Sequence, residues 1–115
     1  MRTPDERFKN LPGFPWAPHY LEWRGLRAHY LDEGTGPRTL LCLHGEPTWS
    51  YLYRDFIRHL APRHRVVAVD HVGFGRSDKP TDPAYYSVER HITNLEKVVG
   101  HLGLEQVVPI VQDWG

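Results

Sequence analysis

The stretch TLLCLHGEPTWSYLYRDFIRHL, residues 39–60, decides the fold of this 115-residue chain. Its LLCL segment, residues 40–43, is a continuous apolar run, which is typical of a β-strand buried on both faces. Apolar residues then recur at helical spacing from Trp49 to Leu60, with Thr48 as the expected N-cap and a proline just beyond the end. A buried strand that leads into an amphipathic helix indicates the start of a parallel α/β sheet.

The same alternation continues toward the C-terminus. Residues 65–70 form a second buried run, and residues 106–111 form a third. Between them Ser87 is the expected cap of a second helix, and Gly103 is expected to end it. The apolar face of this helix consists of Val88, Ile92, Leu95, Val99 and Leu102. Strand, helix, strand, helix, strand predicts right-handed βαβ units.

The segment before this unit is different in character. Residues 1–18 contain several prolines and are expected to form an irregular lead-in. Residues 19–24 and 27–32, separated by Gly25, suit an antiparallel hairpin at the start of the sheet. In the last run Pro109 lacks an amide donor, so we expect either a local defect there or an amide position that faces away from a partner.

Composition and charge exclude several function classes. Lys and Arg number 14 and Asp and Glu number 14, so no basic excess favours nucleic acid or an anionic membrane as a partner. The single cysteine, Cys42, excludes an internal disulfide. No spacing typical of a metal site or a phosphate-binding loop is present, so no metal or cofactor is expected. The charged first ten residues do not resemble a secretory signal, and we expect a soluble cytoplasmic protein.

Chemistry in open α/β sheets gathers at the carboxyl ends of the strands. Three segments are expected there: HGEP at residues 44–47, the loop at residues 70–78, and QDWG at residues 112–115. Each segment is weak evidence alone, whereas their order and spacing together are specific.

Taken together these segments resemble the haloalkane dehalogenases of the α/β-hydrolase superfamily. The resemblance is carried by HGEPTWSYLYR at residues 44–54, GFGRSDKP at residues 73–80 and VQDWG at residues 111–115, and it extends to residues 2–8 and 26–34. It implies that the chain is one incomplete α/β-hydrolase domain, residues 1–115. The nucleophile turn would lie at its end, and the cap domain and the C-terminal half would be absent.

The resemblance also implies roles for particular residues. Asp113 takes the position of the nucleophile, which is Ser in ordinary members of the superfamily. Its carboxylate would displace a halide from saturated carbon and form an alkyl ester, which water would then hydrolyse. The backbone amides of Glu46 and Trp114 would form the oxyanion hole, and the Trp114 indole would also hold the halide. Small haloalkanes, water and halide are then the expected ligands.

Other readings remain open. Trp114 could be a buried aromatic beside the sheet, and the Glu46 side chain could be an ordinary exposed carboxylate. An epoxide hydrolase also places Asp before Trp-Gly at this turn. A third possibility is a catalytically inert hydrolase-like domain, and we expect the 115 residues alone to be inactive.

The remaining polar residues are expected to be mainly structural. His44 and Gly45 would shape the oxyanion loop, with His44 not acting as a base. Gly73 and Gly75 would supply left-handed loop positions. Hydrogen bonds to loop backbone are expected from Asp70, Ser77 and Asp78. His91 and His101 are expected on the wet face of the second helix, and no role is evident for His71.

Overall fold

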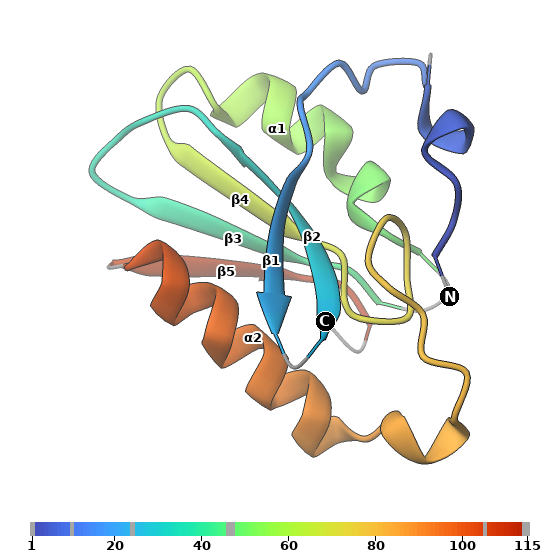
Figure 1. The fold of residues 1–115 in the computed structure, drawn as a ribbon. Helices are drawn as coiled ribbons and strands as arrows, with labels where there is room; N and C mark the ends of the chain where they lie inside the picture. The colour runs from blue at the N-terminus through green and yellow to red at the C-terminus, as the bar shows by residue number, and fades with distance from the viewer. Residues whose placement is uncertain (1, 10, 24, 46–47, 105, 114–115) are drawn as a thin grey trace.

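The structure is a computed structural model that describes residues 2–9, 11–23, 25–45, 48–104 and 106–113. Its strands and helices follow the expected alternation (Figure 1). The strands are β1 (His19–Trp23), β2 (Leu26–Glu33), β3 (Thr39–Leu43), β4 (Arg65–Val69) and β5 (Val107–Val111), and the α-helices are α1 (Arg54–Leu60) and α2 (Val88–Leu102). Short 3-10 helices are η1 (Asp5–Phe8), η2 (Ser50–Tyr53) and η3 (Pro83–Tyr85).

The strands form a mixed sheet in the order β1-β2-β4-β3-β5. The hairpin is confirmed, since β1 and β2 pair in antiparallel fashion, and β2 also pairs antiparallel with β4. The three later strands run parallel, with β3 between β4 and β5. An α/β fold with an antiparallel hairpin followed by parallel βαβαβ is therefore confirmed.

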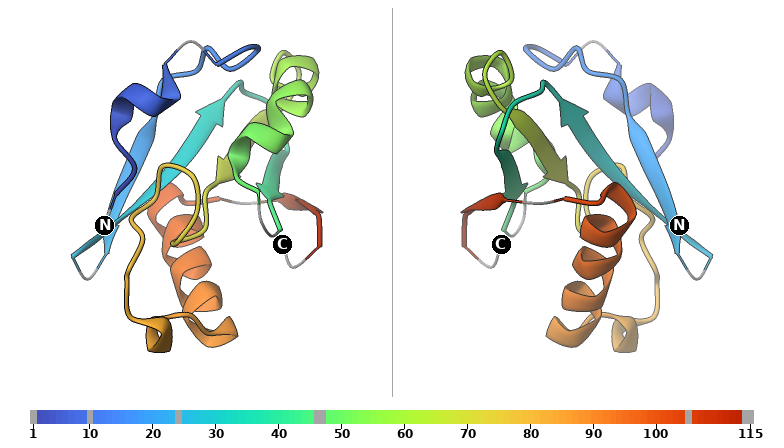
Figure 2. Two further views of the ribbon diagram at one scale, coloured as in Figure 1. Left: turned by 90° about the vertical axis from the view of Figure 1, so that its right-hand side faces the viewer. Right: turned by 90° about the vertical axis from the view of Figure 1, so that its left-hand side faces the viewer.

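The sheet separates two apolar layers because neighbouring residues of a strand point to opposite faces. On one face, Leu40 and Cys42 of β3 pack with Tyr53, directly before α1, and with Ile57 of α1. On the other face Leu41 and Leu43 belong to the layer that includes Val98 of α2. Figure 2 shows α1 and α2 on opposite sides of the sheet. Burying each such aliphatic side chain contributes about 1.5–3 kcal/mol.

The ends of α2 match the prediction. The Ser87 side chain accepts a hydrogen bond from the Arg90 amide, and Gly103 takes the left-handed conformation that ends the helix. The expected apolar face of α2 is only partly covered. Leu95, Val99 and Leu102 pack against the core, whereas Val88 is 61% exposed and Ile92 is 51% exposed.

The first helical segment differs from the prediction. It begins with the 3-10 turn η2 before α1, and its N-terminal residue makes no side-chain capping bond. Thr48 is therefore not the N-cap. Its hydroxyl instead donates to the carbonyl of Gly45, three residues earlier, so it stabilises the loop and not the helix.

The third parallel strand is one residue shorter than expected, because Gln106 has a φ of 51° and lies outside β5. The hydrogen bonds between β3 and β5 decide between the two expectations for Pro109, a local defect or a nitrogen that faces away from a partner. The Gln106 carbonyl and the Gln112 amide both bond to β3. The backbone N–H and C=O groups of the even-numbered residues of β5 therefore point toward β3. Pro109 is out of phase with them, and its nitrogen faces away from β3. The strand needs no local defect.

The lead-in, expected to be irregular, contains η1 and packs on the α1 face of the sheet. Phe14 is buried there against the rings of Trp16, Trp49 and Tyr51. In the described residues no helix is both long and apolar enough to span a membrane.

Candidate active site

The carboxyl ends of β3, β4 and β5 lie at the same edge of the sheet (Figure 1). The segments that follow them begin at His44, Asp70 and Gln112. The three segments singled out in the sequence are thus brought together by the parallel strands, as expected.

Asp113 lies in a sharp turn directly after β5. Its φ is 58°, in the left-handed region that a residue with a side chain seldom adopts, although Asp does so more readily than most. The residue is exposed. A strained turn that presents an exposed residue with a carboxylate directly after a parallel strand has the backbone form expected of a nucleophile turn.

Gly45 lies directly against this turn. A Cβ built on Gly45 would clash with the Cβ of Asp113 and would lie 2.6 Å from the backbone oxygen of Gln112. The Gly45 amide also donates to the Gln112 side-chain oxygen at 3.0 Å. The loop after β3 and the turn after β5 are therefore in contact, and the absence of a side chain at Gly45 permits that contact.

We call residues 44–49, between β3 and η2, the oxyanion loop. The Gly45 carbonyl accepts hydrogen bonds from the His44 Nδ1, the Thr48 amide and the Thr48 hydroxyl. The His44 Nε2 accepts from the amide of His71 at 2.9 Å. Because both ring nitrogens of His44 are engaged and its burial lowers its pKa, it is neutral and supports the loop, as expected.

Glu46, Trp114 and Gly115 lie outside the described residues. The predicted oxyanion amides of Glu46 and Trp114, and the halide role of Trp114, therefore stay predictions.

Two residues join the strand ends without a sequence pattern that predicts that role. Gln112 connects to Gly45 and also donates its amide to the Leu43 carbonyl. The Tyr53 hydroxyl lies 2.7 Å from the Leu43 oxygen and 3.2 Å from the Ile110 oxygen. Burial raises the pKa of Tyr53 to about 12, so it stays a neutral donor. Helical spacing predicts only that Tyr53 is buried. The hydroxyl on its ring is the one sequence feature that indicates a hydrogen bond to the strand ends.

Asp70, at the end of β4, is fully buried and bonds to three different segments. Its carboxylate accepts from the amides of Ser50 at 2.6 Å and Arg76 at 2.9 Å, and it lies 2.8 Å from the His29 Nδ1. Burial alone would raise the pKa of Asp70, but these bonds lower it below its usual value, so it is ionised. The expectation that Asp70 bonds to loop backbone is confirmed.

Ser77 and Asp78 also serve the backbone, as expected. The Ser77 hydroxyl accepts from the His29 amide and donates to the Asp70 carbonyl. Asp78 accepts from the Arg27 amide and pairs with Arg2 of the lead-in. The loop that carries them contains Gly73 and Gly75, which both have the expected positive φ.

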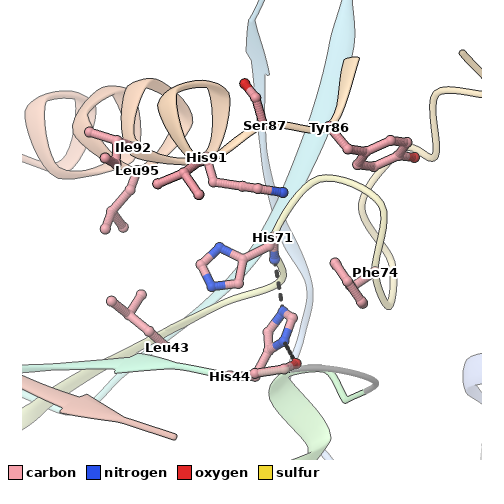
Figure 3. Close-up of a pocket in the computed structure, with 11 residues that line it drawn as sticks. Leu43, His44, His71, Phe74, Tyr86, Ser87, His91, Ile92 and Leu95 are labelled. Atoms are coloured by element: carbon pink, nitrogen blue, oxygen red, sulfur yellow. Dashed lines mark hydrogen bonds between the residues drawn. The ribbon is translucent and has the colours of Figure 1, made fainter. Parts of the chain in front are cut away.

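A cavity of about 440 Å³ lies between the ends of β3 and β4 and the first turns of α2. Its polar lining includes His44, His71 and His91, as Figure 3 shows. Burial lowers the pKa of His71 to about 4. His91 is half-buried beside His71, so its expected place on the wet face of the helix is wrong, whereas His101 is exposed as expected.

Asp113 is not among the residues that line this cavity. Gly45, however, both lines the cavity and contacts the Asp113 turn, so the cavity adjoins the turn that carries the carboxylate. Among the described residues, no group of three or more His, Cys, Asp or Glu side chains is placed to hold a metal ion.

Comparisons with known proteins agree with this architecture. The alpha/beta hydrolase fold family matches residues 38–115. Haloalkane dehalogenases from Mycolicibacterium paratuberculosis and Psychrobacter cryohalolentis are 51% and 49% identical to the whole chain. The chain spans 40% of the length of each of them.

Solved structures are similar as well. A haloalkane dehalogenase from Paraglaciecola agarilytica NO2 is 49% identical, with a TM-score of 0.95 over 99% of this chain and 40% of its own. An epoxide hydrolase mutant from Vigna radiata is 31% identical, with a TM-score of 0.79 over 87% of this chain and 31% of its own.

Proposed function

Because this chain belongs to the alpha/beta hydrolase fold family, we propose that it is the nucleophile-bearing part of a haloalkane dehalogenase, which hydrolyses carbon–halogen bonds to an alcohol and a halide. The observation that carries the proposal is the exposed Asp113 in a left-handed turn against Gly45, in a chain about half identical to haloalkane dehalogenases. Below, the full-length enzyme means a protein that carries this chain and extends to the length of those relatives.

The first step requires a carboxylate and no base. The nucleophile is the carboxylate itself, so no hydroxyl or thiol has to be deprotonated before the attack. One Asp113 oxygen forms a bond to the substrate carbon while the carbon–halogen bond breaks and the halide leaves with the electron pair. The product is an alkyl ester of Asp113. The Trp114 indole N–H is proposed to bind the departing halide, because it is a hydrogen-bond donor on an apolar body.

The second step hydrolyses the ester. Water adds to the ester carbonyl carbon and gives up a proton to a base, and negative charge develops on a former carboxylate oxygen of Asp113. The amides of Glu46 and Trp114 are proposed to stabilise this charge. Collapse of the intermediate releases the alcohol and restores the carboxylate, so haloalkane and water become alcohol, halide and a proton. No cofactor is needed, and the cytoplasmic location stays a prediction.

An epoxide hydrolase is the second candidate, favoured by the similarity to the Vigna radiata structure. That similarity is weaker in both identity and TM-score than the similarity to haloalkane dehalogenases. Both enzymes would use Asp113 as the nucleophile, so halide release distinguishes them.

The test is mass spectrometry of the full-length enzyme mixed with a 1-haloalkane. We expect an alkyl adduct on Asp113 and release of halide. Asp113→Ala should abolish the adduct, and Asp113→Asn should nearly do so, because a neutral amide is a poor nucleophile. Asp55→Asn, at an exposed carboxylate on α1, is the matched control and should retain the adduct. An adduct that survives Asp113→Ala would place the nucleophile elsewhere.

A further inference from the structure

We infer that Asp70, together with His29, is a positioning residue for the oxyanion loop and acts on the second step of the reaction. The inference rests on the proposed function. It starts from the two ends of the loop, which are held by different partners. At its first end, Gly45 is held by Gln112 and by His44. Directly after its far end, the amide of Ser50, the first residue of η2, donates to the Asp70 carboxylate at 2.6 Å.

Asp70 is well fixed for this purpose. The side chains of Asp70 and His29 are both fully buried, and they lie 2.8 Å apart. The His29 amide is in turn bonded to Ser77, whose hydroxyl donates to the Asp70 carbonyl. A Cβ on Gly75 would clash with the Asp70 carboxylate, so the next loop also packs closely against it. The carboxylate therefore has little room to move away from Ser50.

The hydrogen bonds of the pair have a defined direction. An ionised carboxylate only accepts hydrogen bonds, so the His29 Nδ1 is the donor. The two Asp70 oxygens then receive three donors: the amides of Ser50 and Arg76 and the imidazole of His29. Asn in place of Asp70 would turn an NH2 group toward at least one of these donors and break the arrangement.

The position of the loop matters to only one of the two steps. Halide displacement removes negative charge from Asp113, so it gains nothing from donors aimed at the carboxylate. Ester hydrolysis creates negative charge on that oxygen and depends on those donors. A displaced loop should therefore slow hydrolysis of the ester and leave its formation unchanged. General loss of folded enzyme would lower both steps together.

The experiment follows both steps in the full-length enzyme with a 1-haloalkane, by rapid quenching and mass spectrometry. Outright removal of an oxyanion donor slows comparable reactions by roughly 10²–10³-fold, so for Asp70→Asn we expect ester hydrolysis to slow by at least about tenfold. The alkyl ester should accumulate, while its rate of formation stays within about twofold of wild type, which is small beside the hydrolysis effect.

His29→Leu is the second variant, in case Asp70→Asn fails to fold. It removes the His29 donor and keeps the Asp70 carboxylate with the Ser50 and Arg76 amides. The carboxylate then loses one of the groups that fix it, so ester hydrolysis should again slow and the ester should accumulate. Asp78→Asn is the matched control, because Asp78 bonds to Arg27 and Arg2 rather than to the oxyanion loop, and it should turn over without accumulation.

Equal slowing of both steps, or an ester lifetime like that of wild type in a folded variant, would overturn the inference. Failure of the wild-type enzyme to form any ester would instead overturn the proposed function, so the two failures are distinguishable.

Discussion

Gly45 and Asp113 are in contact across two parallel strands: a Cβ on the glycine would occupy the space of the aspartate Cβ. The contact joins the loop after β3 to the turn after β5, which are 68 residues apart in the sequence. It makes the geometry of the candidate site sensitive to a single methyl group.

Gly45→Ala should therefore lower both stability and activity of the full-length enzyme. Overpacking of this kind costs about 1–3 kcal/mol in unfolding free energy, and the displaced turn should reduce halide release at least about tenfold, since small misplacements at a reacting group are costly. Urea unfolding and a halide-release assay measure the two effects. Gly100→Ala is the control. Outside the neighbouring residues and the backbone of its own helix, no atom lies within 4 Å of the new Cβ. Alanine in a helix should raise the free energy of unfolding by about 0.5–1 kcal/mol. Equal behaviour of the two variants would contradict the contact.

Bromide should bind the full-length enzyme beside the nucleophile. If the Trp114 indole holds the halide, bromide will quench tryptophan fluorescence saturably, and Trp114→Phe will weaken that binding because the N–H donor is lost. Saturable quenching that is unchanged in Trp114→Phe would remove this residue from the halide site. Without any saturable response, the balance would move toward an epoxide hydrolase.

His71 should make stability depend on pH. Its pKa is about 4 in the folded protein because of burial, and His44 and His91 nearby lower it further, against about 6.5 in an unfolded chain. Between these values the unfolded chain binds more protons. The stability associated with neutral His71 is therefore complete above pH 6.5 and is lost as the pH falls toward 4, by up to about 1.4 kcal/mol per pH unit.

The variant His71→Leu cannot titrate, so urea unfolding of the full-length enzyme should show a flatter pH dependence between pH 6.5 and 4 than wild type. Above pH 7 the two curves should run parallel. Equal slopes below pH 6.5 would show that His71 is as readily protonated in the folded protein as in the unfolded chain.

Residues 1–115 expressed alone should neither turn over substrate nor protect β5 strongly. In β5, Val108 is 40% exposed and Val111 is 56% exposed, so little apolar burial holds the strand. Hydrogen exchange should be fast across Val107–Val111 and slower in β3. Strong cooperative protection of β5 would show that this part of the chain closes its own core. Multiple turnovers would show that it needs no base beyond these residues.

The sequence predicted those parts of the fold that depend on local patterns. Gly25 separates the two hairpin strands, and Ser87 and Gly103 bound α2, as expected. The prediction of Thr48 as an N-cap is wrong because a threonine before a helix can bond backward to a carbonyl as well as forward to an amide. Local sequence does not distinguish the two. Val88 shows a related limit, since periodicity identifies an apolar face and does not say what covers it.

The site was predictable only in part. The order of the strands places Asp113 beside the oxyanion loop, because β5 pairs with β3. The alternation of strands and helices does not fix that order, since the same alternation also allows β5 to pair with β4. The pairing of Asp70 with His29 spans 41 residues and depends on β2 lying next to β4 in the sheet. No spacing in the sequence signals such a contact, because it exists only once the antiparallel hairpin docks against the parallel strands.

The outward phase of Pro109 affects how a further strand could be added to the sheet. On that side of β5, Val107 and Val111 present amide donors and the rung between them has none. A strand aligned so that its own carbonyl faces this rung forfeits a hydrogen bond, and a strand shifted in register forfeits a different set. Because Pro109 supplies no amide donor, it weakens non-specific strand pairing at this edge of the sheet. It favours a partner strand whose alignment accommodates the missing donor.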